Sequence, residues 1–223
     1  MSDHHEEENQ VSSDNLDSSD VGIVHIYTGH GKGKTTASLG LALRSVGYGH
    51  KIYMVQFLKG GSYTGELVAT ENHIPNFKIV QFGKGCINTE SQVKLFGFDN
   101  EHCPNPEMKR KFGSCGDCRH CFIADDEEAS QAKLGFEHAK EIINKGEHEV
   151  VILDELTYLI PKNYVQLEEV LDLIKNKPRH VELVITGRDA HPELIKVADL
   201  VSEVQEVKHP FSSGMEGRKG IEF

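Results

Sequence analysis

Several features that mark membrane, secreted or nucleic-acid-binding proteins are missing from this sequence. No apolar run approaches the length of a membrane span and no signal peptide precedes the first apolar segment, so we expect a cytoplasmic protein. Basic residues are outnumbered, with 24 Lys and Arg against 35 Asp and Glu, which argues against nucleic acid as the main partner. Tryptophan is absent, so any aromatic stacking on a substrate falls to Phe or Tyr.

The negative charge is concentrated at one end of the chain. Residues 1–20 contain seven Asp and Glu, no Lys or Arg and few apolar side chains, so they account for seven of the eleven net negative charges. Such a segment cannot bury enough apolar surface to fold. We therefore predict a disordered acidic tail over residues 1–20 and one domain over residues 21–223.

From residue 22 onward, short apolar runs alternate with longer segments of helical periodicity. The predicted strands are Gly22–Thr28, Lys51–Phe57, Phe77–Phe82, Glu149–Leu153, Val181–Thr186 and Leu200–Val204. The predicted helices are Thr35–Val46, Glu66–Asn72, Asp126–Lys145, Leu167–Asn176 and Pro192–Ala198. Repeated strand–helix units predict an α/β fold with a mostly parallel, doubly wound sheet.

A glycine-rich turn joins the first strand to the first helix. It reads Thr28-Gly29-His30-Gly31-Lys32-Gly33-Lys34-Thr35-Thr36. A phosphate-binding P-loop has this context: a strand, a glycine-rich turn and a helix that begins at Gly-Lys-Thr. In such a loop, Lys34 would reach phosphate oxygens and Thr35 would offer its hydroxyl to Mg²⁺ or Mn²⁺. The usual spacing places a glycine at position 28, where this chain has a threonine, so the loop is a variant.

Charged residues follow three other predicted strands. Asp154 and Glu155 end a strongly apolar run, which predicts carboxylates beside the P-loop for holding the metal ion. Arg188 follows the next strand, and Lys59 follows the second one. Because parallel strands end at the same edge of a sheet, we expect these side chains to lie together, where the two cations suit a polyphosphate.

Four of the five cysteines lie in a segment of about residues 83–122 that interrupts the strand–helix rhythm. They are Cys103, Cys115, Cys118 and Cys121. In a cytosolic protein this clustering favours a metal over disulfides. A [4Fe–4S] cluster held by all four, and zinc held by a C-x₂-C pair with Cys103 and one of Cys121, His102 or His120, are both open, and free thiols are the third alternative.

The P-loop and several further motifs resemble one known family. The loop differs only at His30, an asparagine in the family, from the T-G-N-G-K-G-K-T-T loop of ATP:corrinoid adenosyltransferases of the cobalamin-salvage type. The other matching stretches are Val55–Gly60, Leu153–Tyr158, Leu167–Val170, Ile185–Arg188, Ala198–Glu203, Val207–Phe211 and Gly220–Phe223. The resemblance runs from about residue 22 to residue 223, with the 83–122 region as an insertion. There Gly85-Cys86-Ile87-Asn88 replaces the family's G-F-T-W, whose aromatics help to displace the lower ligand of cobalt.

The resemblance implies a RecA-like P-loop fold, a homodimer and a defined reaction. The 5′-deoxyadenosyl group of ATP moves to the Co(I) of a reduced corrinoid and triphosphate leaves, with a separate reductase or the cysteine-held metal supplying the electron that makes Co(I). The expected catalytic residues are Lys34, Thr35, Glu155 and Arg188. The expected nucleotide- and substrate-binding residues are Gly29, His30, Gly31, Lys32, Gly33, Lys34, Thr35, Thr36, Lys59, Lys208 and His209. The expected magnesium-binding residues are Thr35, Asp154 and Glu155.

Two other functions are compatible with the motifs alone. A P-loop kinase or ATPase with a metal-binding clip would release ADP or phosphate instead of triphosphate. A non-enzymatic, ATP-dependent sensor or metal-delivery protein would keep its metal when Lys34 is replaced.

Overall fold

The computed structural model describes residues 21–60, 64–84, 123–210, 214, 215, 217, 218, 220 and 221. The predicted acidic tail over residues 1–20 lies outside the described residues. So do residues 85–122 of the predicted insertion, including Cys103, Cys115, Cys118 and Cys121. The tail, the insertion and its metal site therefore stay predictions.

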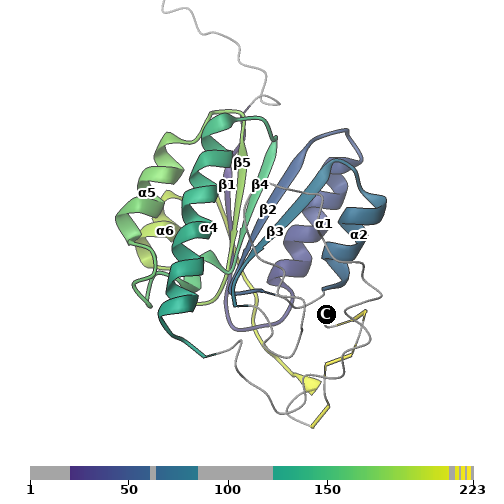
Figure 1. The fold of residues 1–223 in the computed structure, drawn as a ribbon, viewed down its shortest axis with the longest axis vertical. Coiled ribbons are helices and arrows are strands. Elements are labelled where there is room, and N and C mark those ends of the chain that lie inside the picture. Colours follow the sequence, from purple (N-terminus) through teal and green to yellow (C-terminus); the bar gives the residue numbers. More distant parts are fainter. Residues whose placement is uncertain are drawn as a thin grey trace, which may run out of the picture.

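Six parallel strands form a single sheet in the order β3-β2-β4-β5-β1-β6 (Figure 1). The strands are β1 (Val24–Thr28), β2 (Ile52–Phe57), β3 (Phe77–Phe82), β4 (Val150–Asp154), β5 (Glu182–Thr186) and β6 (Leu200–Glu203). The chain reverses its direction of travel across the sheet after β3, so β1 and β4 lie on either side of β5. The predicted α/β class and parallel sheet are confirmed.

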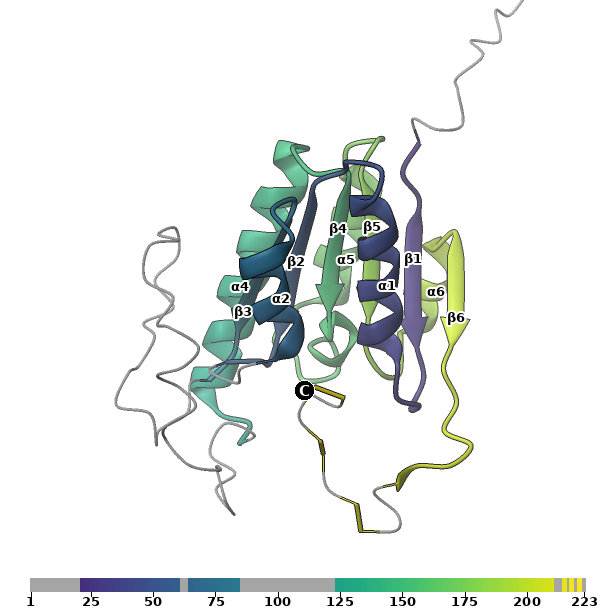
Figure 2. The ribbon, with the colours of Figure 1, turned by 90° about the vertical axis from the view of Figure 1, so that its right-hand side faces the viewer.

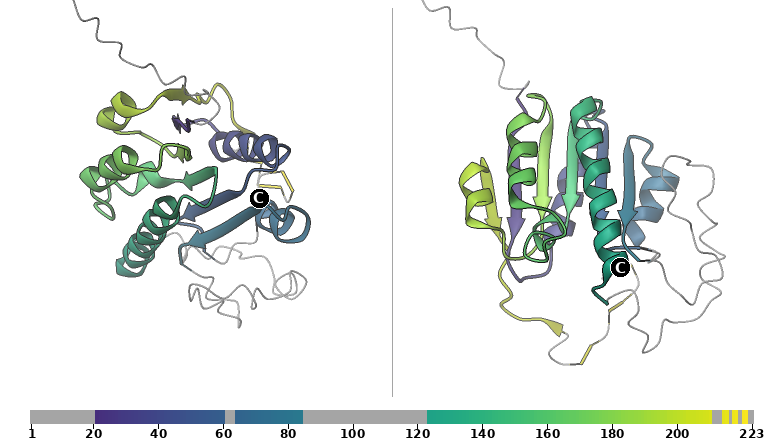
Figure 3. Two further views of the ribbon diagram at one scale, coloured as in Figure 1. Left: turned by 90° about the horizontal axis from the view of Figure 1, so that it is seen from above. Right: turned by 60° about the vertical axis from the view of Figure 1, so that its left-hand side comes forward.

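Helices cover both faces of the sheet (Figure 3). On one face lie α1 (Lys34–Val46) and α2 (Gly65–His73), and on the other lie α4 (Asp126–Lys145), α5 (Leu167–Asn176) and α6 (Pro192–Val197). A short 3₁₀ helix, η3 (Leu156–Tyr158), follows β4 and was not predicted. Every other described element lies within two residues of its predicted bounds, and glycine, proline or Asp marks the ends of α1 and α4 and the start of α6. None of the described helices has the length and apolarity that crossing a membrane requires.

The alternation of side chains along the strands produces two cores. Val55, Phe57 and Leu153 point towards α4 and α5, in the larger cluster of buried residues. Met54 and Ile152, one position away on the same strands, point towards α1 and α2 in the smaller cluster. Near-continuous apolar strands are expected when helices cover both faces of a parallel sheet. A polar residue within such a strand therefore stands out.

Candidate active site

The P-loop lies at the carboxyl edge of the sheet and is folded around its own lysine. The Lys34 side chain is only 6% exposed, and its Nζ donates hydrogen bonds to the carbonyl oxygens of Gly29 (2.6 Å) and Gly31 (2.9 Å). Gly29 and Gly33 have φ angles of 96° and 122°, which residues with a Cβ rarely adopt. The loop thus has the curvature of a phosphate cradle, with the ammonium group held in its interior.

The strand-end segment after β6 supports this loop from outside. The Gly31 amide donates to the Val204 carbonyl (2.7 Å), and the Val204 amide donates to the Thr28 carbonyl (2.8 Å). A Cβ on Gly29 would lie 2.5 Å from the Val204 oxygen, and one on Gly31 would lie 2.7 Å from the Gln205 carbonyl carbon. Two of the loop glycines are therefore required by packing against residues 204–205, in addition to any role at a phosphate.

Asp154 is the centre of a buried hydrogen-bond network beside the loop. Its side chain is fully buried at the end of β4. Oδ1 accepts hydrogen bonds from the hydroxyls of Thr35 (2.8 Å) and Thr186 (2.7 Å). Oδ2 accepts from Lys59 Nζ (2.9 Å) and Gln56 Nε2 (3.3 Å). Because a carboxylate has about four lone-pair positions, these four donors occupy all of its accepting capacity.

The network continues along the carboxyl edge of the sheet. Gln56 lies opposite Asp154 on one side and opposite Gln81 on the other, and it accepts a hydrogen bond from Gln81 Nε2 (2.9 Å). Gln56 also donates to Glu66 in the first turn of α2 (3.1 Å). Sequence reasoning missed Gln56, Glu66, Gln81 and Thr186. The available signal was the strand alternation, since Gln56, Gln81 and Thr186 are polar positions at the ends of apolar strands on the α1 face.

Glu155 follows Asp154 in a left-handed backbone conformation, with φ of 65°. Its amide donates to the Thr186 hydroxyl (3.0 Å), which fixes the turn after β4. Burial and the neighbouring Asp154 charge raise the pKa of the Glu155 carboxyl, and the positive charges of Lys34, Lys59 and Arg188 oppose that rise. Burial lowers the pKa of Lys34, an effect that the Glu155 and Asp154 charges counter. The predicted charged residues therefore share one electrostatic environment.

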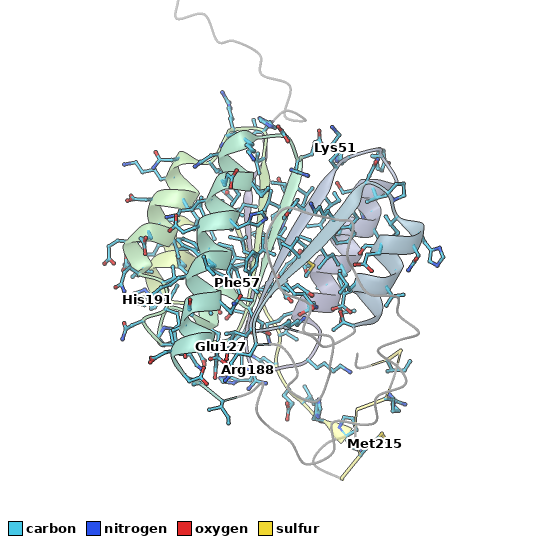
Figure 4. The ribbon with its side chains drawn as sticks, in the orientation of Figure 1. Lys51, Phe57, Glu127, Arg188, His191 and Met215 are labelled. Atoms are coloured by element: carbon cyan, nitrogen blue, oxygen red, sulfur yellow. The ribbon has the colours of Figure 1, made fainter. Side chains whose placement is uncertain are left out.

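Arg188 reaches this environment from the loop after β5. Figure 4 shows it near the lower end of the sheet, whereas Lys51, which directly precedes β2, lies at the upper end. Its carbonyl accepts a hydrogen bond from the Thr157 hydroxyl (2.6 Å), while its own side chain is exposed. The next residue, Asp189, pairs with His30 Nε2 of the P-loop at 3.0 Å, with both side chains largely exposed. The loops after β1 and β5 thus meet at this edge.

Some predicted residues lie apart from the Asp154 network. Lys32 and Thr36 are exposed on the P-loop and the first turn of α1. Lys208 and His209 follow β6 in the segment that passes below the carboxyl edge of the sheet in Figure 2. The structure therefore gathers Lys34, Thr35, Lys59, Asp154, Glu155 and Arg188 at one edge of the sheet.

The donor set at Asp154 and Thr35 suits a magnesium ion that arrives with phosphate. A carboxylate and a hydroxyl are hard oxygen ligands, as Mg²⁺ prefers. In the part of the chain that the structure describes, no group of three or more His, Cys, Asp or Glu side chains could hold a metal by itself. Two protein oxygens completed by phosphate and water are the arrangement that P-loop proteins use.

Comparison with known proteins assigns the family. The family model described as "ATP:corrinoid adenosyltransferase BtuR/CobO/CobP" matches residues 20–102 and 100–223. The chain belongs to this family. The corrinoid adenosyltransferase of Escherichia coli (strain K12) is 33% identical over 202 residues, which cover 91% of this chain and 86% of the relative. The corrinoid adenosyltransferase CobA of Salmonella typhimurium (strain LT2) is 34% identical with the same coverage.

Membership of this family confirms the resemblance found in the sequence. A corrinoid adenosyltransferase of Sinorhizobium sp. is also similar, at 32% identity over 206 residues that cover 91% of this chain and 80% of the relative. The P-loop, the Asp154 network and the Arg188 loop all lie within the two matched ranges. The individual roles of these side chains are considered next.

Proposed function

We propose that this chain is an ATP:corrinoid adenosyltransferase of adenosylcobalamin biosynthesis. The observation that carries the proposal is the P-loop closed around Lys34 beside Asp154, in a chain that belongs to the adenosyltransferase family. The loop and the charged edge around it offer a place for a polyphosphate. The transferred group is the 5′-deoxyadenosyl moiety of ATP, and the acceptor is the cobalt of a reduced corrinoid.

The reaction is a displacement at the C5′ carbon of ATP. The electron pair of Co(I) forms the cobalt–carbon bond, while the bond between C5′ and the α-phosphate oxygen breaks and its electron pair leaves with triphosphate. Because Co(I) is itself a strong nucleophile, no general base or activated side chain is needed. The protein has to hold the two substrates in line and stabilise the charge on the departing triphosphate.

The charged residues at the carboxyl edge would share the second task. Lys34 would exchange the carbonyl oxygens of Gly29 and Gly31 for phosphate oxygens, and Arg188 would approach the triphosphate from the loop after β5. Thr35 and Asp154 would hold Mg²⁺, with Glu155 bound to it through water. That ion would supply positive charge against the leaving triphosphate. The P-loop therefore binds the part of ATP that departs.

The test is an assay of products with ATP and a chemically reduced corrinoid. We expect a light-sensitive adenosylated corrinoid and one equivalent of triphosphate. Lys34→Ala should lower kcat/KM by about a hundredfold or more, because it removes a charged donor from the leaving group. Lys51→Ala is the matched control, because Lys51 is exposed just before β2, at the end of the sheet away from the P-loop (Figure 4). This variant should react at the wild-type rate.

Two results would contradict the proposal. One is the absence of any photolabile product when the corrinoid is fully reduced. The other is the release of ADP or inorganic phosphate in place of triphosphate, which would favour a kinase or ATPase.

The remaining predictions rest on the sequence and on the family. We propose that Cys103, Cys115, Cys118 and Cys121, which lie outside the described residues, bind a [4Fe–4S] cluster or zinc. Metal analysis of anaerobically purified protein, beside a variant with all four changed to serine, tests this. A homodimer, a partner reductase and a cytoplasmic location complete the proposal, and sedimentation of the purified protein tests the first of these.

A further inference from the structure

Lys59 stands out among the four donors to Asp154. Thr186 and Gln56 are completely buried, and each makes a further hydrogen bond. Thr186 accepts one from the Glu155 amide, and Gln56 accepts one from Gln81. Thr35 is anchored in the first turn of α1. Lys59 lies in the loop after β2, and its side chain is 25% exposed. Its Nζ has a second carboxylate neighbour, Glu66, whose Oε1 is 3.8 Å away. Lys59 is therefore the donor that can leave most readily.

The position that Lys59 occupies is one that a metal ion would need. With four donors on its two oxygens, Asp154 has no lone-pair position left for direct contact with a cation. Three positive side chains, Lys34, Lys59 and Arg188, already face the carboxylates at this edge. A free divalent ion would bring two more positive charges next to them. These contacts and charges therefore disfavour binding of a metal ion without nucleotide.

A polyphosphate changes this balance. ATP brings several negative charges to the carboxyl edge, and a lysine side chain is long enough to move its ammonium group from one oxygen ligand to another nearby. The exchange frees one oxygen of Asp154 while the total number of charge-assisted hydrogen bonds is kept. Movement of Lys59 and arrival of the metal would then depend on the same event.

We propose that Lys59 and the metal ion compete for Asp154, and that Lys59 moves to the polyphosphate when magnesium nucleotide binds. This makes Lys59 a positioning residue that couples metal binding to nucleotide binding. The inference rests on the proposed function only for the identity of the nucleotide, since the pair of Lys59 and Asp154 is observed in the structure.

The first experiment measures binding of Mn²⁺ alone, by loss of the electron paramagnetic resonance signal of the free ion. Without nucleotide, Lys59→Met should bind Mn²⁺ at least about tenfold more tightly than the wild type, because the carboxylate is freed and a positive charge is removed. Lys51→Met removes a lysine at the other end of the same strand and should bind as the wild type does. Adding Asp154→Asn to Lys59→Met should abolish the gain.

The second experiment measures binding of tripolyphosphate with Mg²⁺ by calorimetry. Here Lys59→Met should bind about tenfold more weakly than the wild type, because a charge-assisted hydrogen bond to phosphate is lost. Opposite changes in the two affinities are the signature of exchange, and a purely structural role would lower both. Lys59→Gln, which also removes the positive charge beside Asp154, should show the same two directions if Lys59→Met folds poorly.

Three outcomes would overturn the inference. They are an unchanged or weaker Mn²⁺ affinity in both Lys59 variants, a gain that survives Asp154→Asn, and an unchanged tripolyphosphate affinity. Failure of the proposed function would appear elsewhere, as a lack of adenosylated corrinoid, and it would leave the Mn²⁺ measurements unaffected.

Discussion

Thr186 offers a direct measure of how much the Asp154 network stabilises the fold. Its hydroxyl donates to Asp154 Oδ1 at 2.7 Å and accepts from the Glu155 amide at 3.0 Å, within a fully buried environment. Thr186→Val keeps the shape of the side chain and removes both hydrogen bonds. A bond to a buried charged group contributes about 1.5–3 kcal/mol, and an amide left without a partner costs about 1 kcal/mol more. We expect a loss of about 2.5–4 kcal/mol in the free energy of unfolding.

Thr186→Ser is the matched control for this substitution. It retains the hydroxyl and loses one buried methyl group, which costs about 1 kcal/mol. Urea unfolding of the three proteins gives the free energies, and the thermal midpoint should fall by about 2–4 °C for each kcal/mol lost in a chain of this size. If the valine variant is as stable as the wild type, the hydroxyl contributes nothing and the network is not a stabilising element.

Two further predictions concern backbone packing and pH. Gly60→Ala should destabilise the protein and weaken ATP binding, because the added Cβ would lie 2.2 Å from the Gly83 carbonyl oxygen. Gly40→Ala is the control, because Gly40 lies on α1 with open space around it. Urea unfolding should show that this second change stabilises the protein by about 0.5–1 kcal/mol. Burial lowers the pKa of both His138 and His148, so the folded state binds fewer protons than the unfolded chain. Stability should be complete above the unfolded histidine pKa of about 6.5 and decline as the pH falls below it. Urea midpoints at a series of pH values test this, and a flat profile over that range would contradict it.

The fold could be predicted from the sequence because local signals and global topology agree in this chain. Most strands are short apolar runs, and some helix ends carry recognisable caps, such as Asp125 before α4 and Gly146 in the left-handed conformation after it. The carboxyl-edge rule for parallel sheets also predicts that Asp154, Lys59 and Arg188 lie together. η3 was missed because three residues carry too little periodicity to identify a helix.

The site was predicted less completely because its hydrogen bonds depend on which strands are neighbours. Gln56 bonds both Gln81 and Asp154 only because β2 lies between β3 and β4, an order that the sequence does not state. The sequence likewise predicts that Gly29 and Gly31 bind phosphate, but not that they pack against residues 204–205. That contact depends on the pairing of β1 with β6. Side-chain types can be read from a sequence, whereas partners require the topology.

The polar groups of the candidate site already have hydrogen-bond partners, and this has a consequence for selectivity. Lys34 is bonded to two carbonyl oxygens and Asp154 to four donors, so a ligand must replace existing hydrogen bonds before it gains any. Such an exchange gives little net free energy unless the new partner is stronger than the old one, and charge-assisted bonds to phosphate are about twice as strong as bonds to neutral groups. A nucleoside without phosphates cannot supply them. The closed loop should therefore bind adenosine more weakly than ATP, by a larger factor than the difference in contact area alone would suggest.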